Sequence, residues 1–187
     1  MTIGLFGGSF NPVHNGHIAL AKHMLAAASL DEIWFVVSPQ NPFKKSGDLL
    51  PEKIRFEMTA IALKNEEHLV ASDYEFRLPR PSYTWNLLEH LKQDYPQHKF
   101  VLFMGADNWM VFDKWSHSRD ILDNYHILVH SRDDIHIDNV PDNVQVVNAE
   151  QCDISSTMIR QRVREHLSIR GLVPESIEDM VIKYYNS

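Results

Sequence analysis

Residues 7–17 read Gly-Gly-Ser-Phe-Asn-Pro-Val-His-Asn-Gly-His and directly follow a short apolar run, Ile3-Gly4-Leu5-Phe6. The run predicts a buried strand, the glycines predict a tight turn, and a helical pattern begins at about Ile18. Backbone N–H groups and a helix N-terminus would converge here, as they do in sites for phosphate and other anions. The imidazoles of His14 and His17 lie where they could donate to the same anion. The stretch therefore predicts a phosphate-binding loop that carries two histidines.

The same loop is also compatible with a helix-capping turn that has incidental histidines, or with half of a zinc site. Zinc needs further ligands, and Cys152 is the only cysteine in the chain, so the pattern favours phosphate over metal. Gly7 and Gly8 lack the Cβ atoms that would keep a phosphate away from the backbone, and Gly16 leaves room beside the helix start. We expect the loop to be functional.

The composition is typical of a soluble globular protein. The chain has 187 residues, of which 44% are hydrophobic and 23% charged, and its formal net charge is −7. This acidic balance argues against a general nucleic-acid binder, and the uncharged apolar runs are far too short for a membrane span. One cysteine cannot form an internal disulfide, and no basic segment leads an apolar signal core, so we expect a cytoplasmic protein. An anionic ligand would need a local positive pocket in this chain.

Short apolar runs alternate with helical patterns, which predicts a parallel sheet covered by helices on both faces. The expected strands are 2–6, 32–37, 69–72, 100–104, 126–130 and 144–147, and the expected helices are 18–28, 51–63, 82–94, 119–123, 156–166 and 174–184. We therefore expect one doubly wound α/β domain over residues 1–187, with ligands at the carboxyl ends of the strands. Residues 38–50 and 105–117 follow strands and are long enough to be functional loops.

A second helix start with anion-binding character lies near the C-terminus. Three consecutive hydroxyl residues precede an apolar-periodic stretch: Ser155, Ser156 and Thr157. Such a run is a strong signal for a helix N-terminus. The expected buried stripe of this helix consists of Ile159, Val163 and Leu167. Arg160 shares the face of the cap. Alone, the pattern is most simply a plain cap with solvated arginines, but together with residues 7–17 it would form a second wall of a phosphate site.

Weaker patterns follow other strands. Segment 80–84, Arg-Pro-Ser-Tyr-Thr, stands ahead of a helix that one of its hydroxyls could simply cap. Asp107 follows a strand and is placed to accept hydrogen bonds from ribose hydroxyls, with a turn-forming Asp as the ordinary alternative. Trp115 could stack on an aromatic ligand or fill a core gap. Lys44 lies in a loop from which a lysine could reach an anion.

With these residues assembled, the chain resembles the bacterial nicotinate-mononucleotide adenylyltransferases over essentially its whole length. The resemblance rests on residues 7–17, Pro81–Thr84, Gly105–Asn108 with Trp115, and Ile154–Arg160. The first and last segments mark the wider nucleotidylyltransferase superfamily, and the others narrow it to the pyridine-nucleotide branch. The resemblance implies a Rossmann-like sheet of the nucleotidylyltransferase type. It also implies transfer of AMP from ATP to nicotinate mononucleotide in NAD biosynthesis, which gives the deamido dinucleotide and pyrophosphate.

The resemblance further implies roles for individual residues. His14, His17 and Arg160 would be catalytic and would stabilise charge as pyrophosphate departs. The residues that would bind ATP are Gly7, Gly8, Ser9, Phe10, Asp107, Ile154, Ser155, Ser156 and Thr157. The residues that would bind the mononucleotide are Asn11, Lys44, Ser82, Tyr83, Thr84, Trp115 and Ser116. Mg²⁺ would be bound through the ATP phosphates, with no protein side chain as a ligand. No covalent enzyme intermediate is implied, so positioning and charge stabilisation would suffice.

The chain departs from the family pattern in three places, one of which is Trp85-Asn86-Leu87 in place of the usual continuation after Pro81–Thr84. Residues 41–44 read Asn-Pro-Phe-Lys, where relatives often have Pro-Pro-His and a basic residue, so phosphate contact there would fall on Lys44. Ser116 replaces the aromatic residue that is common after Trp115. The expected partners are ATP and nicotinate mononucleotide, without nucleic acid or membrane, and a homo-oligomer is compatible with the sequence.

Two classes of alternative function compete with this one. The first is another transferase of the same fold, acting on nicotinamide mononucleotide, phosphopantetheine or a cytidylyl donor. The second is a nucleotide-binding regulator without catalysis. The intact histidine pair and Arg160 count against the regulator, because a binder would not require all three.

Overall fold

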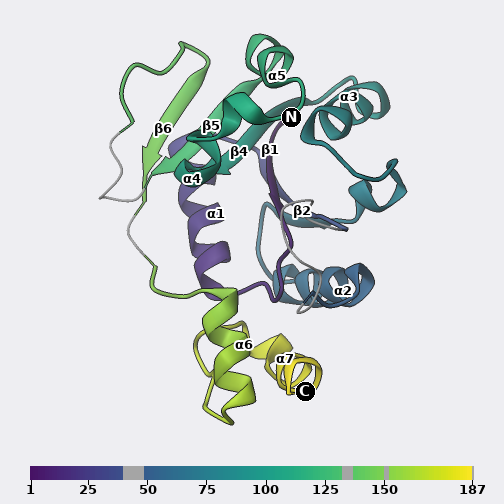
Figure 1. The fold of residues 1–187 in the computed structure, drawn as a ribbon, viewed down its shortest axis with the longest axis vertical. Coiled ribbons are helices and arrows are strands. Elements are labelled where there is room, and N and C mark those ends of the chain that lie inside the picture. Colours follow the sequence, from purple (N-terminus) through teal and green to yellow (C-terminus); the bar gives the residue numbers. More distant parts are fainter. Residues whose placement is uncertain (40–48, 132–136, 150–151, 187) are drawn as a thin grey trace.

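Strands in the described part of the chain form one parallel sheet of six strands (Figure 1). The computed structural model describes residues 1–39, 49–131, 137–149 and 152–186. The strands are β1 (Thr2–Gly8), β2 (Glu32–Val37), β3 (Leu69–Ser72), β4 (Lys99–Gly105), β5 (His126–Ser131) and β6 (Val144–Asn148). They lie in the order β3-β2-β1-β4-β5-β6, and each neighbouring pair is parallel. The doubly wound parallel fold predicted from the sequence is confirmed.

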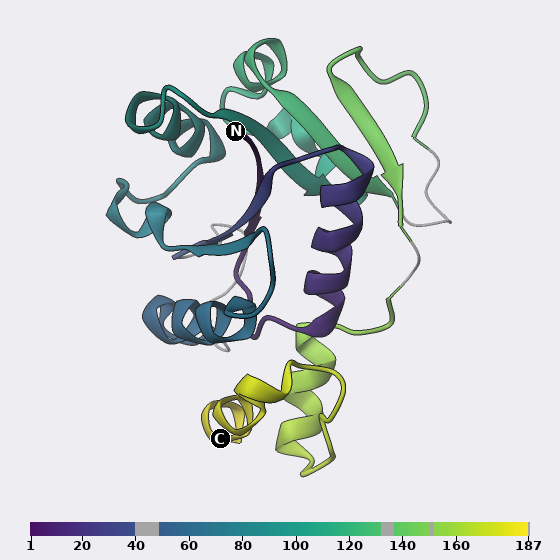
Figure 2. The same cartoon turned by 180° about the vertical axis from the view of Figure 1, so that it is seen from behind.

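Helices connect the strands and cover both faces of the sheet (Figures 1 and 2). The α-helices are α1 (Asn15–Ala27), α2 (Glu52–Leu63), α3 (Thr84–Asp94), α4 (Ala106–Trp109), α5 (Ser118–Asn124), α6 (Ser156–Arg164) and α7 (Glu178–Tyr185). Short 3₁₀ helices are η2 (Tyr74–Arg77), η3 (Phe112–Lys114) and η4 (Glu175–Ile177). Helices α6 and α7 pack on each other beside the start of α1, at the lower end of the molecule in Figure 1.

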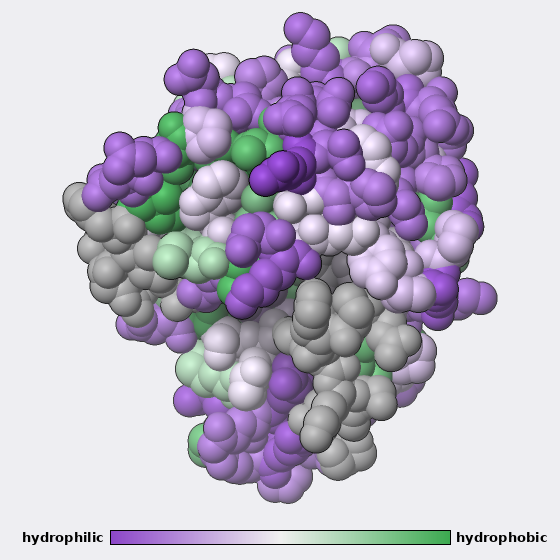
Figure 3. Space-filling model, turned by 45° about the horizontal axis from the view of Figure 1, so that its top comes forward, coloured by the Kyte–Doolittle hydropathy of each residue, from purple (hydrophilic) through white to green (hydrophobic). Residues whose placement is uncertain are grey.

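The sheet separates two apolar cores because strand residues alternate between its faces. In β4, Val101 and Phe103 pack with residues of α1 and α2, whereas Leu102 and Met104 pack with residues of α3 and α5. Both sets are buried, as expected for a parallel strand covered on both sides. Hydrophilic residues cover most of the face shown in Figure 3, where apolar residues form only small groups. None of the described helices has the length and apolar content needed to cross a bilayer.

Three local expectations are wrong. Strand β1 continues through Gly8, which pairs with Val37 of β2, so the turn begins only at Ser9. Residues 105–117 are not one loop, because α4 and η3 fold within them. Leu167 is 48% exposed, since α6 ends before it, whereas the other two residues of the expected stripe are buried.

The strand order reverses between β1 and β4, since the chain moves outward from β1 to β3 and returns to β4 on the other side. Ligands of open α/β sheets bind beyond the carboxyl ends of the strands at such a switch point. Residues 9–14 follow β1 directly and α4 follows β4 directly. The fold therefore places the first predicted loop and Asp107 at the edge of the sheet where a ligand would bind.

Candidate active site

His14 caps α1, and His17 lies in the first turn of that helix. The backbone N–H of His17 donates to Nδ1 of His14 at 3.3 Å, and the backbone N–H of His14 donates to Nδ1 of His17 at the same distance. This reciprocal arrangement is a capping box built from two imidazoles. It explains why the helix begins at Asn15 and not, as the sequence indicated, at about Ile18. The two rings stack with their centroids 3.6 Å apart.

The capping bonds also assign the proton of each ring. A ring nitrogen that accepts a hydrogen bond carries no proton, so each neutral imidazole holds its proton on Nε2. Two Nε2–H donors thus stand at the start of α1, where the helix dipole also favours an anion. The ring of His17 packs edge-to-face against Phe6 and Phe10, with centroids 5.9 and 5.2 Å away, so packing fixes its orientation.

Burial keeps His14 neutral. Its side chain is nearly fully buried, and this burial lowers the pKa of His14 from 6.5 to about 4. A neutral His14 donates to an anion through Nε2–H alone and keeps Nδ1 free of a proton for the cap. His14 is therefore neutral at neutral pH, with its proton on Nε2.

We expect the free energy of unfolding to fall as the pH is lowered from 6.5 toward 4, the two pKa values of His14. In this window the unfolded chain binds a proton on His14 that the folded chain does not, so acid favours unfolding. The shift corresponds to about 3 kcal/mol. Urea unfolding across this pH range would measure it, with His14→Asn as the control, because asparagine caps helices without titrating. Identical pH dependence in both proteins would contradict the assignment.

The second predicted helix start meets the first loop. Ser155 caps α6, since its Oγ accepts from the N–H of Met158 at 3.2 Å. Ser156 Oγ donates to the carbonyl oxygen of Pro12 at 2.8 Å, and Arg160 Nη1 donates to that of Asn11 at 2.8 Å. These partners lie 144 and 149 residues apart along the chain. The fold thus joins the two helix starts, and we call this contact the helix-start junction.

The helix-start junction concentrates donors for an anion. Arg160 Nη2 donates to Thr157 Oγ1 at 3.4 Å, while its Nε is buried and has no hydrogen-bond partner in the described part of the chain. Two helix N-termini, two imidazole N–H groups and one guanidinium gather here in a chain of net charge −7. Such a group of donors is of the kind that phosphate oxygens require.

Asn11 and Phe10 lie inside the junction. The Asn11 side chain is 5% exposed, and its Oδ1 accepts from the hydroxyl of Tyr185 at 2.6 Å and from the N–H of Leu50 at 3.2 Å. The ring of Phe10 belongs to the apolar core, and its backbone has a φ of +42°. These side chains hold the shape of the loop, and their contact with a ligand stays a prediction.

Glycine occupies the two ends of the loop for different reasons. A Cβ atom at Gly7 would meet no atom within 4 Å, so the backbone there borders open space. A Cβ atom at Gly16 would come within 2.9 Å of Cys152 Sγ and 3.1 Å of His14 Nδ1. Gly7 leaves room for a ligand, whereas Gly16 is required by the packing of the imidazole cap.

The residues predicted to bind the mononucleotide follow β3 and β4. Tyr83 is the N-cap residue of α3, but its side chain makes no capping hydrogen bond. Thr84 is the first residue of that helix. Ser82 does not cap it either, since its hydroxyl donates to Oε1 of Glu75 at 2.7 Å. Burial raises the pKa of the Glu75 carboxyl, and hydrogen bonds from Ser82 and Ser38 partly oppose the shift. The first-turn N–H groups of α3 thus have no side-chain cap.

Asp107 and Ser116 are both exposed. Asp107 precedes η3 in the chain, and Ser116 follows it. Trp115 ends this helix and is half-buried, and its ring packs against Phe112 with centroids 5.6 Å apart. The Trp115 ring is therefore held by a ring contact in a residue that is not fully buried. Lys44 lies outside the described residues.

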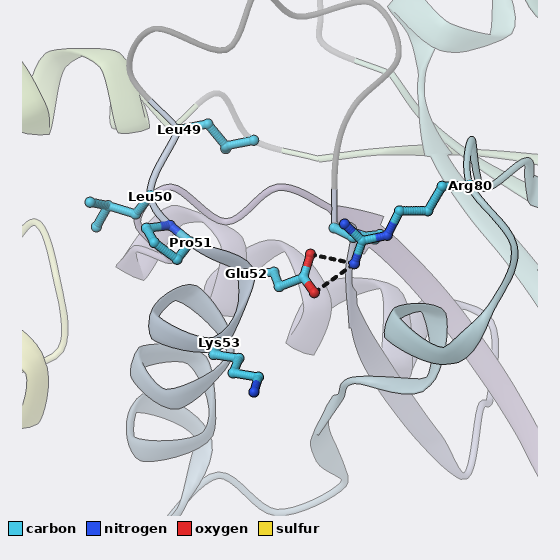
Figure 4. Close-up of a pocket in the computed structure, with 7 residues that line it drawn as sticks. Leu49, Leu50, Pro51, Glu52, Lys53 and Arg80 are labelled. Atoms are coloured by element: carbon cyan, nitrogen blue, oxygen red, sulfur yellow. Dashed lines mark hydrogen bonds and ion pairs between the residues drawn. The ribbon is translucent and has the colours of Figure 1, made fainter.

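A pocket of about 470 Å³ opens at the start of α2 (Figure 4). Its lining consists of Pro39, Leu49, Leu50, Pro51, Glu52, Lys53 and Arg80. Arg80 Nη2 donates to both carboxylate oxygens of Glu52, at 2.6 and 2.8 Å. This ion pair ties the segment before α3 to the first turn of α2, so residues 80–84 are held beside the pocket.

A family model described as Cytidylyltransferase-like matches residues 5–162. A protein of Cytophaga hutchinsonii is 44% identical to this chain, and the match covers 100% of both sequences. A protein of Bacteroides fragilis is 42% identical over 98% of this chain and 92% of its own. Both are named probable nicotinate-nucleotide adenylyltransferase. This chain belongs to the nicotinate-nucleotide adenylyltransferase family. The resemblance inferred from the sequence is confirmed.

A solved adenylyltransferase has the same fold. The Plasmodium falciparum nicotinic acid mononucleotide adenylyltransferase complexed with NaAD matches with a TM-score of 0.80, covering 99% of this chain and 97% of that one. The two sequences are 20% identical. The parallel sheet with helices on both faces is thus the Rossmann-like nucleotidylyltransferase fold.

Sequence reasoning missed three residues that hold the candidate site together: Arg55, Glu75 and Tyr185. Arg55 is fully buried. It shares one face of α2 with Met58 and Ala62 at helical spacing, and a charge on an apolar face was the signal that could have found it. Tyr185 left no such signal, because its partner Asn11 is 174 residues away in the chain.

Proposed function

We propose that this chain transfers AMP from ATP to nicotinate mononucleotide, forming nicotinate adenine dinucleotide and pyrophosphate in NAD biosynthesis. The helix-start junction carries the proposal, because it joins the loop of His14 and His17 to Arg160 at the switch point of the sheet. The full-length similarity to relatives named for this activity supports it. The cytoplasm is the proposed compartment.

The reaction needs no protein nucleophile. A phosphate oxygen of the mononucleotide attacks the α-phosphorus of ATP, and the bond from this phosphorus to the oxygen that bridges the β-phosphate breaks. Pyrophosphate leaves with the electron pair of the broken bond. The Nε2–H groups of His14 and His17 and the guanidinium of Arg160 would stabilise its growing charge, because their donors are already in place. Backbone N–H groups at the starts of α1 and α6 would hold the remaining phosphate oxygens.

The acceptor would lie over the segments that follow β3 and β4. The start of α3 offers N–H groups without intrahelical partners, and Tyr83 and Thr84 stand at this start. Such a terminus suits the nicotinate carboxylate or a phosphate. Trp115 would stack on the pyridine ring, and Asp107 would accept from the adenylate ribose hydroxyls.

We propose that Mg²⁺ arrives with ATP. The donors at the helix-start junction are N–H and guanidinium groups, which suit phosphate oxygens and repel a cation. Among the described residues, no three His, Cys, Asp or Glu side chains gather as a metal site. Mg²⁺ keeps several water ligands and is commonly held by substrate phosphates, so this donor set fits a phosphate-held ion. Bound in this way, it would offset part of the negative charge of the polyphosphate.

Pyrophosphate release by the purified chain tests the function. With ATP and Mg²⁺, we expect release to be at least about tenfold faster with nicotinate mononucleotide than with nicotinamide mononucleotide, because only the acid offers a charge to the start of α3. Chelation of Mg²⁺ should stop the reaction. Equal rates with both acceptors would contradict acid selectivity. No release with either acceptor, while ATP still binds, would favour a regulator.

A further inference from the structure

A buried guanidinium contacts the loop after β1 that takes part in the helix-start junction. Arg55, in the first turn of α2, is 0% exposed. Its Nε donates to the carbonyl oxygen of Leu50 at 2.8 Å, its Nη2 to that of Pro39 at 3.0 Å, and its Nη1 to that of Ser9. The donors are thus directed at main-chain carbonyl oxygens, and within the described residues Arg55 makes no salt bridge.

The three carbonyl oxygens belong to three different segments. Ser9 opens the loop after β1, Pro39 follows β2, and Leu50 precedes α2. Asn11 adds a second connection, because its Oδ1 accepts from the N–H of Leu50 at 3.2 Å. One side chain therefore joins the loop after β1 both to the end of β2 and to the start of α2.

Stability alone does not account for an arginine at this position. Burial lowers the pKa of Arg55, whereas the fields of Tyr185 and Glu52 raise it, and the guanidinium remains charged. Moving such an ion out of water costs several kcal/mol. An apolar side chain would extend the buried face of Met58 and Ala62 without that cost. An arginine serves at this position because only a forked donor can hold three backbone segments at once.

We propose that Arg55 is a positioning residue that fixes the ATP-phosphate loop relative to the acceptor side of the site. This inference rests on the proposed function, which gives the loop from Ser9 to ATP and residues 80–84 to the acceptor. The ion pair between Arg80 and Glu52 ties those residues to the start of α2, which Arg55 anchors. In-line transfer requires the attacking oxygen and the phosphorus in one geometry, and a misplacement of about 1 Å can cost about 100-fold in rate. Arg55 sets that geometry without touching either substrate.

Two substitutions separate geometry from charge. Arg55→Met removes all three hydrogen bonds, and Arg55→Lys keeps the charge but not the forked donor. We expect kcat to fall about 10- to 100-fold in the methionine variant and by a smaller factor in the lysine variant. The KM values for ATP and for the mononucleotide should stay close to those of the wild type, because each substrate still meets its own loop.

Met58→Ala is the matched control. Met58 is fully buried on the same helix, so the substitution leaves a cavity that destabilises the fold while the guanidinium stays in place. Assayed well below the Tm of each protein, this control should keep the wild-type kcat. If the role of Arg55 were purely structural, the Arg55 variants and Met58→Ala would have similar kcat values.

Amide hydrogen exchange gives a second measurement that does not need turnover. Exchange at residues 9–11 and 49–50 should be faster in both Arg55 variants and unchanged, relative to the rest of the chain, in Met58→Ala. Wild-type kcat in a folded Arg55 variant, or equal loss of kcat in Met58→Ala, overturns the inference. If Arg55→Met does not fold, the kcat and the amide exchange of Arg55→Lys decide between the two outcomes. If the wild-type chain releases no pyrophosphate, the proposed function is wrong and the kinetic comparison does not apply. In that case, unchanged exchange at residues 9–11 and 49–50 in the Arg55 variants overturns the role of Arg55.

Discussion

Replacing His17 with alanine is expected to lower kcat about 10²- to 10³-fold, the usual cost of losing one preorganised donor to a developing negative charge. The Nδ1 of His17 accepts from the backbone N–H of His14, so in the proposed reaction Nε2–H would be the donor to pyrophosphate. In the proposed site the N–H groups of two helix starts would still bind ATP, so its affinity should change much less than kcat. Steady-state pyrophosphate release and calorimetric binding of ATP measure the two quantities.

His17→Gln is the control that separates chemistry from helix capping. His17 occupies the third position of α1, where glutamine is one of the ordinary capping-box residues and can reach back to the N-cap backbone. The glutamine variant should therefore keep most of the stability that alanine loses, about 1 kcal/mol, and yet lose most of the turnover. If glutamine restores both, His17 acts only through the cap, and the catalytic assignment is wrong.

Much of the fold could be predicted because strands buried on both faces appear as local apolar runs. The six expected strands and six expected helices are all present, with ends that shift by a few residues. The errors arise where tertiary pairing overrides a local pattern. Gly8 has the sequence character of a turn but remains in β1, because β2 pairs with it. Residues 105–117 coil into short helices that no strong local periodicity announces.

The candidate site divides in the same way. The sequence places the start of α1 at about Ile18, three residues late, because a histidine is not a usual capping residue. The start of α6 could be predicted, because its cap depends on neighbouring residues, as the bond from Met158 N–H to Ser155 Oγ illustrates. The junction of the two helix starts could not, since Ser156 and Pro12 meet across 144 residues. The role of Arg55 could not be predicted for the same reason: no local pattern says which three carbonyl oxygens a buried guanidinium will reach. Spacing predicts groups that lie on one element, and tertiary contacts decide which of them cooperate.

Arg160→Met is expected to lower kcat/KM for ATP at least about 100-fold. Hydrogen bonds from a guanidinium to a phosphate are worth about 1.5–3 kcal/mol each, so two of them account for this loss. The substitution also removes the donor to the carbonyl oxygen of Asn11, which holds α6 against the phosphate loop. Arg160→Lys keeps the charge but not the fork and should recover only part of the loss.

Arg162→Met is the matched control, because it removes the same charge from the same helix. The Nε of Arg162 donates to the carbonyl oxygen of Ser168 at 2.8 Å, a contact that is not part of the helix-start junction. Its kcat/KM for ATP should therefore equal that of the wild type, measured by pyrophosphate release at several salt concentrations. If Arg162→Met lost as much as Arg160→Met, the positive charge of α6 as a whole would carry the effect. The specific contact between Arg160 and Asn11 would then have no part in binding ATP.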